Sequence, residues 1–191
     1  MSAQAVSLLA GADNRLLRLV DRLDPAALQS ATPCAGWDAR ALLSHTLQTI
    51  EAFSAAADGG DGPSEAELFS GDDILGGDPA LIAKEITSRS HRAWGLVEDW
   101  ERTLTTVLGP MPAAQAIAIV TFSTLIHSWD LAGALGEPVE FTEGEAALAE
   151  GVAAALVPGT RPAGLFAAEV TAPATATPTQ RVIAFTGRSP L

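Results

Sequence analysis

The chain has 191 residues, a formal net charge of -12 and a hydrophobic fraction of 48%. This length favours one domain that can bury a sizeable core, and the apolar content excludes a largely disordered chain. A surface this acidic repels phosphate, so we expect neither nucleic acid nor a membrane as a partner. Cys34 is the only cysteine, and the N-terminus lacks a basic segment before a long apolar run. We therefore expect no disulfide, no signal peptide and a cytoplasmic location.

The first third of the chain predicts two helices and an acidic loop. Leucines at helical spacing predict a helix over about 5–23. Asp38 is a good N-cap for a second helix. The segment 58–77 is rich in glycine and acidic residues, and it predicts a surface loop with one helical turn around 65–69.

Asp78 followed by Pro79 is typical of a helix start, with an N-cap and a proline in the first turn. Apolar residues at helical spacing continue from Ile82 to Trp100 and predict that this third helix extends about that far. Residues 104–107 are β-prone, and we expect 109–112 to form a turn into the fourth helix.

The fourth helix is predicted from segment 117–135, which contains no Lys, Arg or Glu. Its ionisable side chains are His127 and Asp130, and helical spacing places Ser123, Thr124 and His127 on one face. The segment approaches membrane-spanning length, but these two polar residues and the absence of flanking positive charge favour a buried helix. A buried imidazole needs a hydrogen-bond partner or a metal.

The remaining chain predicts a helical extension. Gly136 is suited to end the fourth helix, and a T-x-x-E capping box at Thr142 predicts a fifth helix to about Leu156. An irregular tail over 158–178 and a short helix over 179–185 follow. Four long helices predict an all-α four-helix bundle over about 5–135, with the C-terminal helix and tail over 136–191 in the same single domain.

Three histidines and one cysteine are the candidate functional residues. His45 and His127 lie in the middle of two predicted bundle helices and could meet in the core, as bundle metal ligands do. Two imidazoles are fewer than the three protein ligands of a catalytic zinc, so their spacing alone favours hydrogen-bonded core histidines. His91 lies off the apolar stripe and indicates a surface position. Cys34 precedes a helix N-terminus, which can activate a thiol, but packing of the turn is the favoured interpretation.

Three sequence boxes resemble one bacterial family. They are TPCAGWD at 32–38 with LLSH at 42–45, HSWDLA at 127–132, and VIAFTGRSP at 182–190. These boxes are similar, in the same order, to those of the DinB-like, mycothiol-dependent maleylpyruvate isomerase-like metal-binding proteins. The resemblance implies a DinB-like four-helix bundle that holds a divalent metal, zinc or nickel. It also implies a cytoplasmic protein of bacteria that use mycothiol.

The resemblance implies metal ligands from one histidine on the second helix and an E-x-x-x-H pair on the fourth. His45 and His127 stand at the two histidine positions, but Ser123 stands at the glutamate position. A serine hydroxyl is a poor zinc ligand and cannot act as a carboxylate base.

Three outcomes remain open for the site. Asp130 could become the third ligand, an acidic loop residue such as Asp72 or Asp73 could reach the metal, or the metal has been lost. For Asp130 we favour a buried hydrogen-bonding role, such as orienting an imidazole.

The resemblance favours a divalent-metal enzyme that activates a thiol, with mycothiol as cofactor and a transferase or isomerase reaction. The alternative is a non-catalytic module that binds a small ligand or mediates dimerisation without metal. In both cases we expect a small molecule or thiol as the partner. If the chain forms an oligomer, we expect a homodimer.

Overall fold

The computed structural model describes residues 2–189. The bounds of its helices and strands are α1 (Ser2–Val20), η1 (Ala27–Gln29), α2 (Ala39–Asp58), α3 (Glu65–Leu68), α4 (Pro79–Gly95), β1 (Thr103–Thr106), β2 (Gly109–Pro112), α5 (Ala113–Ala134), α6 (Glu143–Thr160), η2 (Arg161–Ala163) and α7 (Pro178–Phe185). The chain divides after Glu137 into two compact units, which are described separately. The prediction of one domain over the whole chain stays a prediction.

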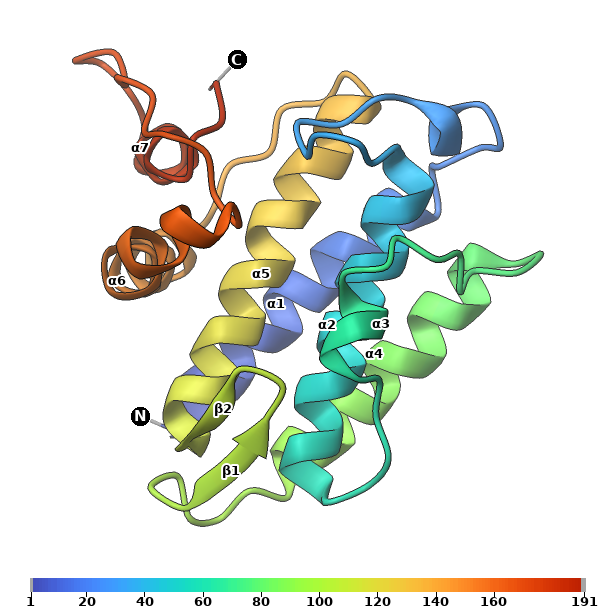
Figure 1. The fold of residues 1–191 in the computed structure, drawn as a ribbon, viewed down its shortest axis with the longest axis vertical. Helices are drawn as coiled ribbons and strands as arrows, with labels where there is room; N and C mark the ends of the chain where they lie inside the picture. The colour runs from blue at the N-terminus through green and yellow to red at the C-terminus, as the bar shows by residue number, and fades with distance from the viewer. Residues whose placement is uncertain (1, 190–191) are drawn as a thin grey trace. The chain divides into compact units, whose positions relative to one another are not determined.

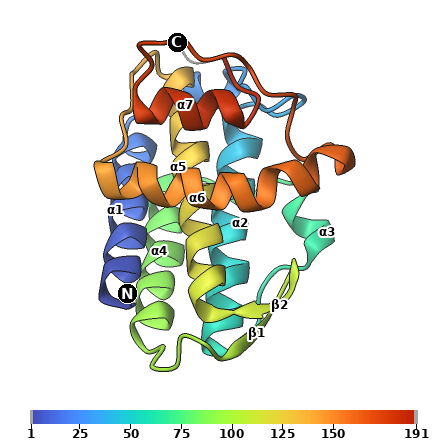
Figure 2. The same ribbon diagram turned by 90° about the vertical axis from the view of Figure 1, so that its left-hand side faces the viewer.

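The first unit is a bundle of the four long helices α1, α2, α4 and α5, which run side by side (Figures 1 and 2). Helix α5 packs on α1 and α2, and α4 packs on the same two helices from another side. The interior of this bundle contains fully buried side chains from all four helices, such as Leu16, Leu47, Trp94 and Leu125. The predicted all-α bundle is confirmed.

Local sequence signals set the starts of the bundle helices. The Asp38 carboxylate accepts a hydrogen bond from Ala41 N and begins α2. The Asp78 carboxylate does the same with Leu81 N and begins α4, with proline in its first turn. Both capping predictions are confirmed.

The region between α4 and α5 differs from its prediction. Helix α4 ends at Gly95 and not near Trp100, whose ring stacks on Trp94 at a centroid distance of 6.3 Å without being helical. Residues 109–112 form β2, which pairs antiparallel with β1, instead of a turn. A two-stranded ladder accepts Pro110 because an edge strand needs no amide hydrogen on its outer side.

Helix α5 is long and apolar enough to cross a membrane by length and composition, but 78% of its apolar window is buried inside the protein. Two buried threonine hydroxyls on this helix are hydrogen-bonded within it: Thr121 donates to Ile117 O and Thr124 donates to Val120 O. These features are typical of the core helix of a folded domain.

The second unit contains α6, η2 and α7, and the two helices lie side by side (Figure 2). Helix α6 begins at the predicted capping box of Thr142 but continues to Thr160, past the predicted end at Leu156. Pro158 lies in the last turn of α6, where the Thr160 hydroxyl also donates to Leu156 O. Gly187 follows α7 with a φ of 89°, where a Cβ atom would meet Ala167 at 2.7 Å.

Candidate metal centre

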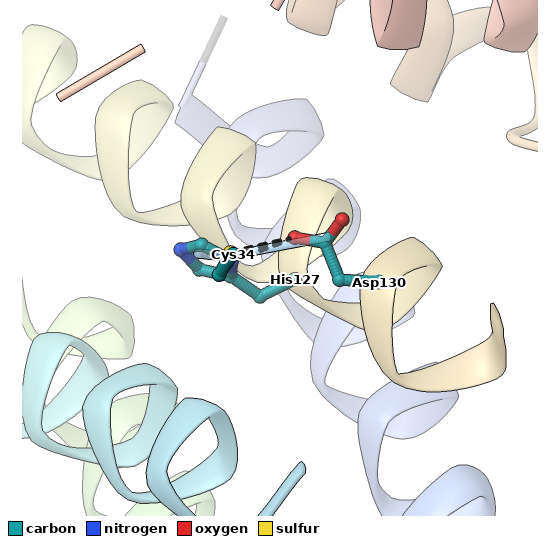
Figure 3. A group of neighbouring side chains, drawn as sticks. All are labelled: Cys34, His127 and Asp130. Atoms are coloured by element: carbon teal, nitrogen blue, oxygen red, sulfur yellow. Dashed lines mark hydrogen bonds and ion pairs between the residues drawn. The ribbon is translucent and has the colours of Figure 1, made fainter. Parts of the chain in front are cut away.

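Cys34 is positioned by a hydrogen-bonded turn between η1 and α2. Thr32 Oγ1 accepts from Cys34 N at 3.2 Å and donates to Trp37 O at 2.8 Å. Trp37 N donates to Cys34 O at 3.0 Å, which closes the turn. The turn holds the Cys34 thiol against α5, where its Sγ lies 3.5 Å from Asp130 Oδ2 (Figure 3).

His127 and Asp130 lie one helical turn apart on α5, as i and i+3. His127 Nδ1 lies 3.1 Å from Asp130 Oδ2, and the Asp130 side chain is fully buried. The same carboxylate oxygen accepts from the Cys34 thiol. Asp130 therefore has the imidazole-orienting position that the sequence favoured for it, and it also contacts a thiol.

Cys34, His127 and Asp130 form a group that could hold a metal ion. One ligand atom from each residue lies within 4.8 Å of the other two. Zinc bonds of about 2.0–2.3 Å at tetrahedral angles place ligand atoms roughly 3.3–3.7 Å apart. The observed separations of 3.1 Å and 3.5 Å are close to that spacing without large movements. Sulfur, nitrogen and carboxylate oxygen are all zinc donors, so the residues present fit zinc.

His45 lies next to this group, on α2. Its ring centroid is 5.1 Å from that of His127, so the structure brings together the two histidines predicted as ligands. His45 Nδ1 lies 2.6 Å from Leu68 O. A carbonyl only accepts hydrogen bonds, so Nδ1 carries the proton and Nε2 keeps its lone pair.

Burial and the neighbouring His127 lower the pKa of His45 to about 4. The side chain is only 7% exposed, which agrees with burial as the main cause. His45 is therefore neutral at neutral pH. A neutral imidazole with a lone pair on Nε2 is the form that binds metals.

The acidic loop supplies one wall of the site. It brings Phe69 to His45 at a centroid distance of 5.6 Å, and the Trp37 ring centroid lies 4.7 Å from that of His45. Arg40 anchors the loop through Asp73 at 2.9 Å. The sequence predicted this loop and its helical turn, but its contact with His45 depends on a backbone carbonyl, which has no sequence signal.

The structure separates the candidates for a third ligand. Within residues 2–189, the group of three ligand atoms includes Asp130 but neither Asp72 nor Asp73. Ser123 is half-buried one turn before His127. The structure adds Cys34 as a ligand candidate, for which the sequence favoured packing of the turn, because its partner Asp130 is 96 positions away. Its occurrence in the same sequence box as His45 was the available signal.

Comparisons with known proteins place this chain in a family. Residues 9–132 match the family described as the mycothiol maleylpyruvate isomerase N-terminal domain. Two crystal structures of the mycothiol-dependent maleylpyruvate isomerase, one of a histidine-to-alanine mutant, have TM-scores of 0.62 and 0.64 to this chain. Their identities are 18% and 19%, over 82% of this chain and 70% of theirs, which shows a common fold. A search of curated proteins found no match.

The family match covers well over half of the chain, including Cys34, His45, His127 and Asp130. This chain belongs to the mycothiol maleylpyruvate isomerase N-terminal domain family.

Proposed function

We propose that the protein binds one divalent metal ion, zinc first and nickel second, and uses it in thiol chemistry. The observation that carries the proposal is the convergence of Cys34, His127 and Asp130 within 4.8 Å. A thiolate among the ligands favours zinc over harder cations such as magnesium. In this arrangement the three residues are the metal ligands, and a fourth position is open to a small molecule.

A second ligand arrangement uses the other nitrogen of His127. If Asp130 keeps its contact with His127 Nδ1, then Nε2 is the metal-binding atom, together with Nε2 of His45. This is the histidine pair that the family resemblance implies, and it leaves Ser123 at the position of the missing glutamate. We prefer the Cys34 arrangement because it supplies three ligands and the histidine pair supplies two.

Zinc bound here would supply Lewis acidity that lowers the pKa of a bound thiol or water. The chain's own residues have separate roles. Without metal, Asp130 holds the His127 ring in place through Nδ1. His45 is neutral, so its Nε2 can accept a hydrogen bond from a bound molecule. Trp37 and Phe69 flank His45 with apolar surface.

The finer proposal is a mycothiol-dependent transferase or isomerase-like reaction in the cytoplasm. Family membership supports it, and so does the fold shared with a mycothiol-dependent maleylpyruvate isomerase. The net charge of -12 supports a small molecule or thiol as the partner, with neither nucleic acid nor a membrane. The alternative is a non-catalytic module that binds a small ligand or forms a homodimer, and the serine at position 123 supports that alternative.

Metal titration of chelator-treated protein tests the proposal. We expect calorimetry to show one zinc site in the wild type, and Co²⁺ to give a sulfur-to-cobalt absorption band that Cys34→Ser removes. Cys34→Ser should weaken zinc binding at least tenfold, whereas His45→Ala should change it less.

The reverse ranking of these variants would favour the histidine pair. Absence of stoichiometric zinc or nickel binding would overturn the metal proposal and favour the non-catalytic module. If zinc binds, a zinc-dependent change in the reactivity of an added small thiol supports the enzyme.

A further inference from the structure

The thiol of the metal-ligand group lies in an accessible loop. Cys34 is half-buried, whereas its neighbours Pro33, Ala35 and Gly36 are exposed. Asp130, which accepts the hydrogen bond from the thiol, is fully buried. A small reagent can therefore approach the sulfur from the loop side, while the carboxylate contacts it from the protein side.

A metal ion and a disulfide at Cys34 compete for the same sulfur atom. The three ligand atoms lie within 4.8 Å of one another, so a metal among them would lie about 2.3 Å from the sulfur. A second sulfur bonded to Sγ would lie at about 2.05 Å. A sulfur in a disulfide is no longer a thiolate, which is the form that binds metal. Metal binding and disulfide formation at Cys34 should exclude each other.

We propose that Cys34 is a thiol–disulfide exchange site that controls metal occupancy; this inference rests on the proposed function. The Cys34 sulfur attacks one sulfur of a small disulfide, RSSR. A bond forms between Sγ and that sulfur as the original S–S bond breaks. The other half leaves as RSH, with the thiol proton reaching it by way of the Asp130 carboxylate. Cys34 is oxidised, and the small disulfide is reduced to one thiol and one protein-bound half.

The exclusion acts in both directions. A zinc ion held by the Cys34 sulfur blocks attack on RSSR, and the mixed disulfide lowers zinc affinity by the same factor that zinc lowers disulfide formation. The negative net charge of the chain favours neutral disulfides over anionic ones. Exposure to small disulfides would then release the metal, and reduction would allow it to bind again.

The test treats chelator-stripped and zinc-loaded wild-type protein with the neutral disulfide 2-hydroxyethyl disulfide. Intact mass spectrometry follows the adduct, and a chromogenic chelator follows released zinc. Every adduct reports Cys34, because the chain has no other cysteine. We expect one adduct on the stripped protein, formation at least tenfold slower with zinc, and one zinc released per adduct. Cys34→Ser should give no adduct, and reduction of the modified protein should restore zinc binding.

Equal adduct rates with and without zinc would overturn the inference. Retention of zinc by the modified protein would also overturn it and would support the His45–His127 arrangement. Calorimetry on the unmodified wild type separates these results from failure of the proposed function. If no zinc binds there, the proposed function and the inference both fail; if zinc binds and the adduct does not affect it, only the inference fails.

Discussion

Two buried aspartate–histidine pairs in the bundle invite comparison. His127 Nδ1 lies 3.1 Å from Asp130 Oδ2, and His91 Nε2 lies 3.0 Å from Asp13 Oδ2. Both carboxylates are fully buried, while the imidazoles are 13% and 37% exposed. The residue types and distances are nearly the same, so the difference between the two pairs comes from what surrounds them.

The pair on α5 has an additional possible ligand, whereas no group of three ligand atoms forms around the pair between α1 and α4 within residues 2–189. Cys34 completes a three-ligand group around Asp130, and this is the one such group within residues 2–189. Asp13 Oδ2 and His91 Nε2 lie 3.0 Å apart and pair α1 with α4. The first pair is suited to bind a metal, and the second links two helices through charge.

The protonation of the second pair is linked to stability. Burial raises the pKa of Asp13, and the contact with Asp13 raises the pKa of His91. A raised pKa in the folded state means that the folded chain holds the proton more tightly than the unfolded chain. Both shifts therefore favour folding at lower pH, however the proton is shared between the two groups.

Loss of metal binding is the largest expected difference between the pairs. His127→Ala should weaken zinc binding by at least about 100-fold, since it removes a ligand from the group. His91→Ala is the matched control and should leave the zinc affinity unchanged. Isothermal titration of stripped protein measures both. Similar losses in the two variants would show that the metal effect is a general consequence of destabilisation.

In the absence of metal, the loss of folding stability should be larger for His91→Ala than for His127→Ala, the opposite order to the loss of zinc binding. His91→Ala should lower the free energy of unfolding by about 2 kcal/mol at pH 6, because it leaves the Asp13 carboxyl buried without a partner. His127→Ala should cost less, since Asp130 keeps the Cys34 thiol as a donor. Urea denaturation of the two stripped variants makes the comparison. A larger loss for His127→Ala would contradict it.

The pH dependence of stability should depend on Asp13. The contribution of His91 is fully present below its unfolded pKa of about 6.5 and is lost as pH rises through its raised folded value. The pKa of Asp13 is raised from its usual value of 3.8, so its contribution to stability also decreases as pH rises above that value. The stability of the wild type relative to Asp13→Asn should therefore fall as pH rises from 6 to 9. Denaturation at several pH values measures this difference, and a rise would show that the sign is wrong.

The smallest expected difference is in the titration midpoints of the individual histidines. In stripped protein, NMR titration should give His45 a midpoint near pH 4 and His91 a midpoint above 6.5. Because the pKa of His45 is lowered on folding, its contribution to stability decreases as pH falls from about 6.5 to 4, opposite in sign to that of His91. The three single His→Ala variants assign the signals. A midpoint near 6.5 for His45 would mean that it is not buried as described.

The sequence alone was sufficient for the helices of the bundle and for part of the site. Caps at Asp38, Asp78 and Thr142 involve residues three positions apart, so they are visible as short patterns. The sequence boxes indicated the family and the pairing of His45 with His127. Helix ends without such caps were less predictable: α4 stops before Trp100, and α6 passes through Pro158.

Only the tertiary structure decided which polar groups meet. The Cys34 thiol reaches Asp130 across 96 positions, Asp13 meets His91 across two helices, and a loop carbonyl fixes the tautomer of His45. None of these contacts has a periodic or local sequence signal, because each depends on how separate segments pack. The amino-acid sequence by itself determined the helices and two candidate ligands, whereas helix packing decided that a thiol and a buried carboxylate complete the candidate metal centre.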